Sequence, residues 1–329
     1  MTRSLHPPPP LLRLALLAGL LLLAMALALA LGSLPLSLAE LWAVLHGQGS
    51  PLAHSIVFEL RLPRMLQAML VGGLLSLAGW QMQLLLRNPL ADPYILGISS
   101  GAALAGLLGL LLGVSGLWLN LWSGLGAGAS LLLLLLLAGR SSSERLLLTG
   151  VMLSSLCVSG VSLILSLAPG ERLRGMLFWL MGDLSQPVPY WPLLLILLVS
   201  AIISAVLHLP LAILSQGETL AYSLGVAIRP LRLLLLLLAS LLTASAVMTA
   251  GSIGFIGMAV PHLARLLCGT ALPAQLAGSL LLGPALLLLA DTASRTLFAP
   301  LQIPVGVCTA LFGAPVFLWL LYRHGTTAR

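Results

Sequence analysis

The sequence predicts an all-α polytopic membrane protein with about ten transmembrane helices. Of its 329 residues, 60% are hydrophobic and only 7% are charged, which excludes an ordinary soluble globular domain. Apolar runs long enough to cross a bilayer recur from one end of the chain to the other. The chain lacks the strict alternation of apolar and polar residues that a transmembrane β-barrel requires. We therefore expect one transmembrane domain covering residues 1–329.

The expected spans follow from the apolar runs and from the polar or glycine-rich breaks between them. In chain order they are 11–31, 61–86, 94–112, 117–137, 146–167, 193–209, 231–249, a short eighth segment that ends at Leu267, 275–290 and 305–322. A cleaved signal peptide is the alternative for the first run, but this run is longer than the apolar part of a usual signal peptide. Residues 1–10, which contain four consecutive prolines, are expected to be a non-helical cytoplasmic arm, and residues 323–329 a cytoplasmic tail.

Several connections are too polar to span a membrane. Residues 33–58 are expected to be a non-spanning connection, and residues 87–93 a tight turn. Residues 169–192 carry several charges, and their middle, Gly175–Met181, is expected to be a short interfacial helix. Residues 215–225 are expected to form a polar amphipathic helix.

The arginines report the orientation of the chain. It contains no lysine, so its net charge of +7 comes from arginine alone, and in a membrane protein such residues indicate topology rather than nucleic-acid binding. Ten spans with both ends inside place these arginines on the cytoplasmic side: Arg3, Arg13, Arg87, Arg140, Arg145, Arg229, Arg232, Arg265, Arg323 and Arg329. The same topology places Arg61, Arg64, Arg172, Arg174 and Arg295 outside. The bias favours this orientation.

The residues that would support chemistry are few. A nucleotide-binding P-loop needs a lysine, so an ATP-driven process requires another polypeptide to hydrolyse the ATP. Cys157, Cys268 and Cys308 are isolated in apolar surroundings and are expected to be packed thiols. His262 has no second ligand at metal-binding spacing, which favours a role at a helix start or in bracing a loop. Asp291, inside an apolar run, has Arg295 as its natural partner one helical turn later.

Four blocks between Arg61 and Trp319 carry a family resemblance. They are RLPRMLQAMLVGGLLSLAGWQMQLLLRNPLADPYILGISSG at 61–101, GSIGFIGMAVPHLAR at 251–265, LAD at 289–291 with Arg295 beyond it, and PVGVCTALFGAPVF at 304–317. Together they resemble the permease subunits of the ABC importers for iron-siderophores, haem and vitamin B12, the FecCD-like family. The strings RLPR at 61–64, RLLL at 145–148 and GAPVFLWLL at 313–321 are most similar to the vitamin B12 permease of that family.

The resemblance implies partners on both sides of a bacterial inner membrane. Permeases of this family form homodimers, bind two ATPase subunits in the cytoplasm and receive substrate from a periplasmic binding protein. Acidic residues of the binding protein would dock on Arg61, Arg64 and Arg295. The alternative for Arg61 and Arg64 is that they only reach the outer headgroups. The chain itself would bind no cofactor, because ATP and Mg²⁺ belong to the partner ATPase.

The resemblance also assigns two cytoplasmic elements. The helix that couples to the ATPase corresponds to 215–225, with these matched residues: Gln216, Gly217, Glu218, Leu224 and Gly225. A helix lying on lipid is the alternative, although this one lacks basic residues on its polar face. The cytoplasmic gate corresponds to Asn88 and Leu90 in one loop and to Ser142 and Ser143 in another. Glu144 departs from the family pattern beside the second loop.

The expected function is therefore transport without chemistry. The first hypothesis is the permease subunit of an ABC importer for vitamin B12, and the same-family alternatives are an iron-siderophore or a haem permease. An intramembrane aspartyl protease would need the motif G-x-G-D, but Leu180 stands in place of the first glycine before Asp183. An ion-coupled secondary transporter would need buried carboxylates in several spans, and only Asp291 clearly qualifies.

Overall fold

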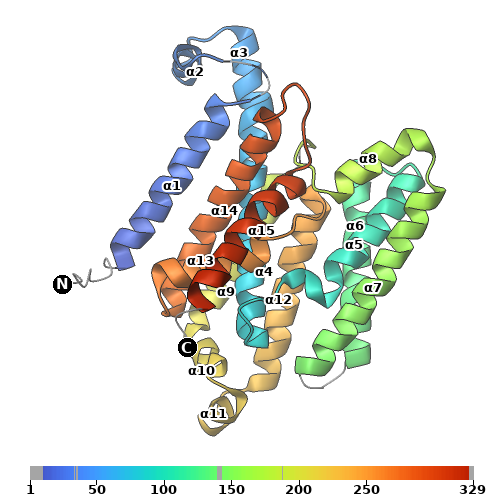
Figure 1. Cartoon of the computed structure of the whole chain (residues 1–329), viewed down its shortest axis with the longest axis vertical. Coiled ribbons are helices and arrows are strands. Elements are labelled where there is room, and N and C mark those ends of the chain that lie inside the picture. Colours follow the sequence, from blue (N-terminus) through green and yellow to red (C-terminus); the bar gives the residue numbers. More distant parts are fainter. Residues whose placement is uncertain (1–9, 33, 35, 139–142, 187, 326–329) are drawn as a thin grey trace.

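The computed structural model describes residues 10–32, 34, 36–138, 143–186 and 188–325, which form helices and irregular segments and no strand (Figure 1). The elements are α1 (Pro10–Ala30), α2 (Leu38–Leu45), α3 (Pro51–Ser55), the π-helical η1 (Ile56–Arg61), α4 (Leu62–Leu86), the 3₁₀-helical η2 (Pro93–Leu96), α5 (Ile98–Leu111), α6 (Leu117–Ala138), α7 (Ser143–Leu167), α8 (Gly170–Leu180), α9 (Tyr190–Val206), α10 (His208–Ser215), α11 (Glu218–Ser223), α12 (Ile228–Ala250), α13 (Ile256–Cys268), α14 (Leu272–Thr296) and α15 (Val305–Gly325). The fold class predicted from the sequence is confirmed.

The predicted spans are all helical. Within the described ranges, six helices are long and apolar enough to cross a bilayer, and they are α1, the continuous helix Pro51–Leu86, α6, α7, α12 and α14. The pair α9 and α10 would make a seventh span with a 68° bend. The helices α5, α13 and α15 are apolar but shorter. Most of the N-terminal arm and residues 326–329 of the predicted tail lie outside the described residues, and α15 extends to Gly325.

The long helix α4 is the centre of the bundle, and it packs against α14, α12, α13 and α9. Two glycines allow the closest crossings. A Cβ at Gly72 would collide with the backbone of Gly283 on α14, and a Cβ at Gly79 would collide with the carbonyl of Gly257 on α13. Close approach of this kind is how membrane helices gain van der Waals packing. A second group, α5, α6 and α7, packs beside this centre, with α8 across its end (Figure 1).

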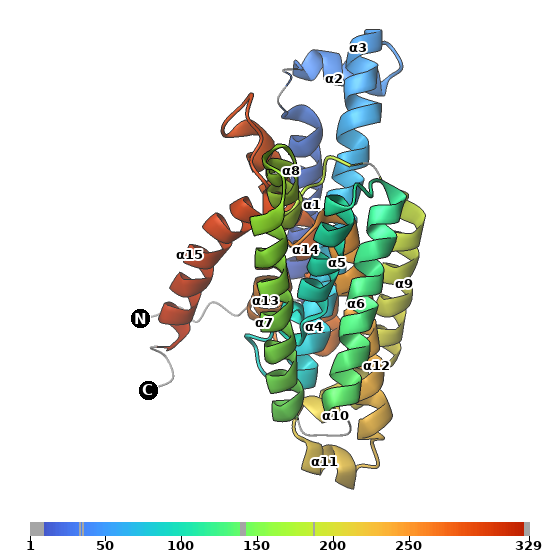
Figure 2. The ribbon, with the colours of Figure 1, turned by 90° about the vertical axis from the view of Figure 1, so that its right-hand side faces the viewer.

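The start of the second span differs from the prediction. The helix begins at Pro51, ten residues before Arg61, because Ser50 caps it and proline suits a first helical turn. Val57 packs with Ala53 and Val44 into a small apolar cluster, so part of the expected non-spanning connection is helical. These first turns and α2 lie beyond the end of α1 at one end of the bundle, which we call the α3 end (Figure 2). The opposite end carries α11.

The third predicted span also begins late. Residues expected from Tyr94 onward are first a 3₁₀ turn, and α5 starts only at Ile98, after Gly97 in a left-handed conformation with φ 80°. A second irregular segment, 251–255, separates α12 from α13. The two segments meet where the Tyr94 hydroxyl donates to the Ile253 carbonyl at 2.9 Å and accepts from the Ile253 N–H at 3.1 Å. Irregular backbone deep in a membrane protein requires such partners.

The prediction for residues 215–225 holds only in part. Gln216 and Gly217 lie outside any helix, because Gly217 has a φ of 134° and separates α10 from α11. The helix is therefore limited to six residues, Glu218–Ser223. A helix is present where the sequence predicts one at 175–181: α8 begins earlier, at Gly170, and ends at Leu180, while its interfacial position stays a prediction.

We predict that Gly79→Ala destabilises the bundle, because the added methyl group must displace the Gly257 backbone. Overpacking of this kind costs about 1–3 kcal/mol. Thermal unfolding of the purified protein in detergent measures the effect. Gly128→Ala on α6 is the matched control, because a Cβ there meets nothing within 4 Å. Equal unfolding temperatures for the two variants would contradict the proposed close crossing.

Candidate functional site

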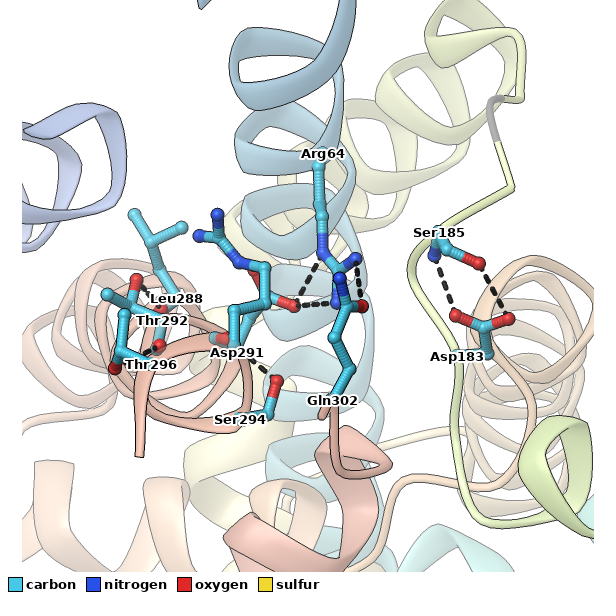
Figure 3. Close-up of polar contacts among 10 residues, drawn as sticks. Arg64, Asp183, Ser185, Leu288, Asp291, Thr292, Ser294, Thr296 and Gln302 are labelled. Atoms are coloured by element: carbon cyan, nitrogen blue, oxygen red, sulfur yellow. Dashed lines mark hydrogen bonds and ion pairs between the residues drawn. The ribbon is translucent and has the colours of Figure 1, made fainter. Parts of the chain in front are cut away.

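A buried ionic cluster lies at the α3 end of the bundle. Asp291 on α14 is fully buried and accepts from Arg295 Nε at 3.0 Å through one oxygen, as the sequence predicted. Its other oxygen accepts from Arg64 Nε and Nη2, each at 2.9 Å. Arg64 also donates to the Gln302 side chain at 3.3 Å, and these groups converge in Figure 3. The carboxylate therefore joins α4 to α14 and orients two arginines.

Arg61 has a different environment from the one expected of a docking residue. It is only 4% exposed, and its guanidinium donates to the carbonyls of Leu29, Ala30 and Leu34. The last carbonyls of a helix lack intrahelical partners, so Arg61 caps the end of α1. Arg61 is therefore buried at the end of α1 rather than exposed.

The three predicted docking arginines nevertheless line one recess. It has a volume of about 360 Å³ and is bounded by η1 and the start of α4, the segment after α1, the end of α14 with the segment after it, and residues 184–185. Its polar lining consists of Glu59, Arg61, Arg64, Gln67, Ser185, Arg295 and Gln302. Arg295 is 6% exposed and the Arg64 side chain 13%. Three guanidinium groups against the carboxylates of Glu59 and Asp291 leave this region with an excess of positive charge.

A second ionic cluster lies at the α11 end. Glu218, the first residue of α11, accepts from Arg232 Nη2 on α12 at 2.6 Å. The same oxygen, Oε1, also accepts from Arg87 Nη2 at 3.3 Å. Arg87 ends α4 in a left-handed conformation, φ 50° and ψ 35°. The family resemblance singled out Glu218 and missed both arginines, although their predicted cytoplasmic placement was a signal that they share this end.

The structure describes both predicted residues of the first gate loop but only one of the two in the second. Asn88 Oδ1 accepts from the Leu90 N–H at 2.9 Å, which forms a tight local turn. Leu90 is 41% exposed at the surface of this turn. In the other loop, Ser143 is the first residue of α7 and Ser142 lies outside the described residues. The gate assignment stays a prediction.

Three further polar residues have local roles. Arg172, expected outside without an assigned role, donates to the Leu111 carbonyl at 2.7 Å and caps α5. Arg174 lies over the Phe178 ring at 6.0 Å. His262 lies within α13 rather than at its start and makes an edge contact with the Phe317 ring at 5.4 Å. Among the described residues, no three His, Cys, Asp or Glu side chains are grouped so as to hold a metal ion.

The α2 segment at the α3 end is fixed by a capping box. The Ser37 N–H and hydroxyl both donate to the Glu40 carboxylate at 2.8 Å, while Ser37 Oγ caps the Glu40 N–H. These bonds lower the pKa of Glu40, with the Ser37 backbone N–H as the larger cause. Trp42, on the same helix, is 67% exposed.

The comparison with protein families decides the identity of the chain. The family model described as the FecCD transport family matches residues 20–323. The chain belongs to the FecCD transport family. It is 39% identical to the hemin transport system permease protein HmuU of Yersinia pestis, over 94% of this chain and 95% of that protein. It is 37% identical to the vitamin B12 import system permease protein BtuC of Escherichia coli O127:H6, over 94% of each.

A solved structure supports the fold of this FecCD-family chain. An inward-facing conformation of a metal-chelate type ABC transporter has a TM-score of 0.83 with it at 34% identity, covering 95% of this chain and 99% of that one. The resemblance to the FecCD family is confirmed, and the identities of 39% to the hemin permease and 37% to the vitamin B12 permease over the same share of the chain do not single out the vitamin B12 permease.

We predict that Asp291→Ala strongly destabilises the protein, because it leaves Arg64 and Arg295 in a buried site without their carboxylate. Removing one partner of a buried ion pair costs about 3–5 kcal/mol. The unfolding temperature in detergent is the measurement, and Asp183→Ala is the control, since the Asp183 carboxylate accepts from the N–H and hydroxyl of the nearby Ser185 (Figure 3). An Asp291→Ala variant as stable as the control would refute the cluster's structural role.

Proposed function

We propose that the chain is the membrane permease of an ABC importer for a large metal chelate. The observation that carries the proposal is membership of the FecCD transport family over residues 20–323, on a bundle with a cationic recess at one end and α10 and α11 at the other. The relatives named above are permeases for hemin and for vitamin B12. The chain would move its cargo without chemical change, and a separate ATPase would use ATP and Mg²⁺.

The orientation we propose places the α11 end in the cytoplasm of a bacterial inner membrane. α1 begins and α15 ends on the side of the bundle toward α11, so both chain ends would be cytoplasmic (Figure 1). Glu218 and the exposed Leu220, Tyr222 and Leu224 would then face two ATPase subunits. Together with Gln216, Gly217 and Gly225 they form the proposed coupling element. Asn88, Leu90, Ser142 and Ser143 form the proposed cytoplasmic gate on the same side.

We propose that a second copy completes the transport path. On α7, the exposed serines Ser155, Ser159, Ser162 and Ser166 form hydrogen bonds to backbone carbonyls three or four residues earlier. Small polar side chains on an exposed face of a span favour a helix interface or a polar path over contact with lipid. Helix α15 also diverges from the bundle toward its end, and its apolar side chains Leu311, Phe312, Val316 and Leu318 are exposed (Figure 2). A homodimer would cover both faces.

The cargo we propose first is vitamin B12, with haem and an iron-siderophore as the alternatives. The strings at 61–64, 145–148 and 313–321 support vitamin B12, whereas the overall identities of 37% and 39% do not separate it from haem. Uptake into vesicles that contain the permease, its ATPase and its binding protein tests the proposal. ATP-dependent accumulation of one of the three chelates would support it. ATP-independent accumulation by the chain alone would overturn it.

We propose that a periplasmic binding protein docks over the recess and places carboxylates near Arg61, Arg64 and Arg295. Because Arg61 caps α1, Arg64 is the informative residue to change. We predict that Arg64→Gln weakens docking by about fivefold and reduces its salt dependence, since one ion pair with the docking partner contributes up to ~1 kcal/mol. Binding at several salt concentrations is the measurement. Arg174→Gln, at an exposed arginine of the same end, is the control, and equal losses in both variants would contradict docking at the recess.

A further inference from the structure

We propose that Arg87 and Arg232 position Glu218 so that movement of α11 is passed to the loop carrying Asn88 and Leu90. We call the three charged residues the Glu218 clasp. The inference rests on the proposed function, because it assumes that an ATPase moves α11. It adds two residues, and a route between the coupling element and the gate, that the family resemblance did not assign.

The clasp joins three separate elements through one carboxylate oxygen. Glu218 Oε1 accepts from Arg232 Nη2 of α12 at 2.6 Å and from Arg87 Nη2 at the end of α4 at 3.3 Å. The charges are one negative and two positive, so neither arginine can leave without weakening the net attraction on Glu218. The side chains are 42% exposed for Glu218, 40% for Arg87 and 20% for Arg232. A displacement of α11 therefore acts directly on α4 and α12.

The backbone around α11 is built to let that helix move as a unit. Gly217 precedes it with φ 134°, and Gly225 follows it with φ 74°. Both conformations are easy for glycine and costly for other residues, so the connections at the two ends resemble hinges. The helix has only six residues, and its attachments to the body include packing against α10, the buried Ala221 and the clasp. The clasp is the charged part of that attachment.

Residues 88–91, which come directly after Arg87, are expected to move with it. Arg87 is directly joined to Asn88, whose side chain binds the Leu90 N–H at 2.9 Å and whose carbonyl accepts from the Ala91 N–H at 3.0 Å. These bonds make residues 88–91 a compact turn rather than a slack connection. The far end of the loop is held inside the bundle by Tyr94, through Ile253. A pull at Arg87 would therefore reorient the turn that bears Leu90.

The exposure of the clasp argues against a purely structural role. Ion pairs this exposed contribute little to folding stability, and they are easily broken and re-formed. In the stabilising ionic cluster at the other end of the bundle, by contrast, the carboxylate of Asp291 is fully buried. An exposed, shared carboxylate suits a contact that changes during a transport cycle.

The test uses the complete transporter in vesicles and measures chelate transported per ATP hydrolysed. We expect Arg87→Gln and Arg232→Gln each to lower this ratio by about fivefold or more, the lower range of typical coupling between sites, while basal ATP hydrolysis and binding of the ATPase are retained. The matched control is Arg229→Gln, at an exposed arginine in the first turn of α12, which should leave the ratio unchanged.

A charge inversion separates the clasp from direct contact of Glu218 with the ATPase. The triple variant Arg87→Glu, Glu218→Arg and Arg232→Glu preserves both ion pairs with reversed signs and should restore the ratio lost in Glu218→Arg alone. A triple variant as uncoupled as Glu218→Arg would overturn the proposal, as would normal coupling in Arg87→Gln. Absence of ATP-dependent uptake by the unmodified complex would instead contradict the proposed function.

Discussion

The fold depends on satisfying backbone hydrogen-bonding groups where the chain is irregular inside an apolar bundle. Residues 251–255 and the segment before α5 leave helical geometry within the bundle, where water cannot replace lost hydrogen bonds. The Tyr94 hydroxyl pairs with both backbone groups of Ile253: it donates to the carbonyl and accepts from the N–H. Gln67 and Gln83 of α4 bind the Thr249 and Met258 carbonyls on either side of the same break. These two glutamines in an otherwise largely apolar helix are therefore explained by the irregular segment that they flank.

Arginine side chains also bind backbone carbonyls that lack a partner at helix ends. Arg61 caps α1, Arg172 caps α5, and Arg13 donates to the Leu267 carbonyl at the end of α13. A guanidinium has several donors in a fixed plane, so one side chain can bind more than one orphan carbonyl. Arg61 and Arg172, which the predicted topology places outside against the usual bias, therefore have a structural role. Arg64, oriented by Asp291 toward the recess, is the better candidate for contact with a partner.

The sequence predicted the spans because each apolar run is long, and it predicted the Asp291–Arg295 pair because the two residues are one helical turn apart. It could not predict the Arg64–Asp291 pair, whose partners are 227 residues apart in the chain. It misplaced the starts of the second and third spans because local caps decide them, namely Ser50 with Pro51 and Asp92 with Pro93. The helix predicted at 215–225 is shorter than expected because Gly217 takes a conformation that ends a helix. Residues 139–142, which include the predicted gate residue Ser142, lie outside the described residues.

The continuous helix Pro51–Leu86 connects the two candidate sites. It carries Arg61 and Arg64 near the α3 end, and Arg87 follows it directly at the α11 end. Its glycine contacts with α13 and α14 are too close to allow it to bend independently, since interiors packed at this density transmit strain. A force on the Glu218 clasp is therefore delivered to the helix that also forms the wall of the recess. Transport of a large cargo requires the two ends of the bundle to open in turn. A single stiff helix that reaches both ends would link the movement of one end to the movement of the other.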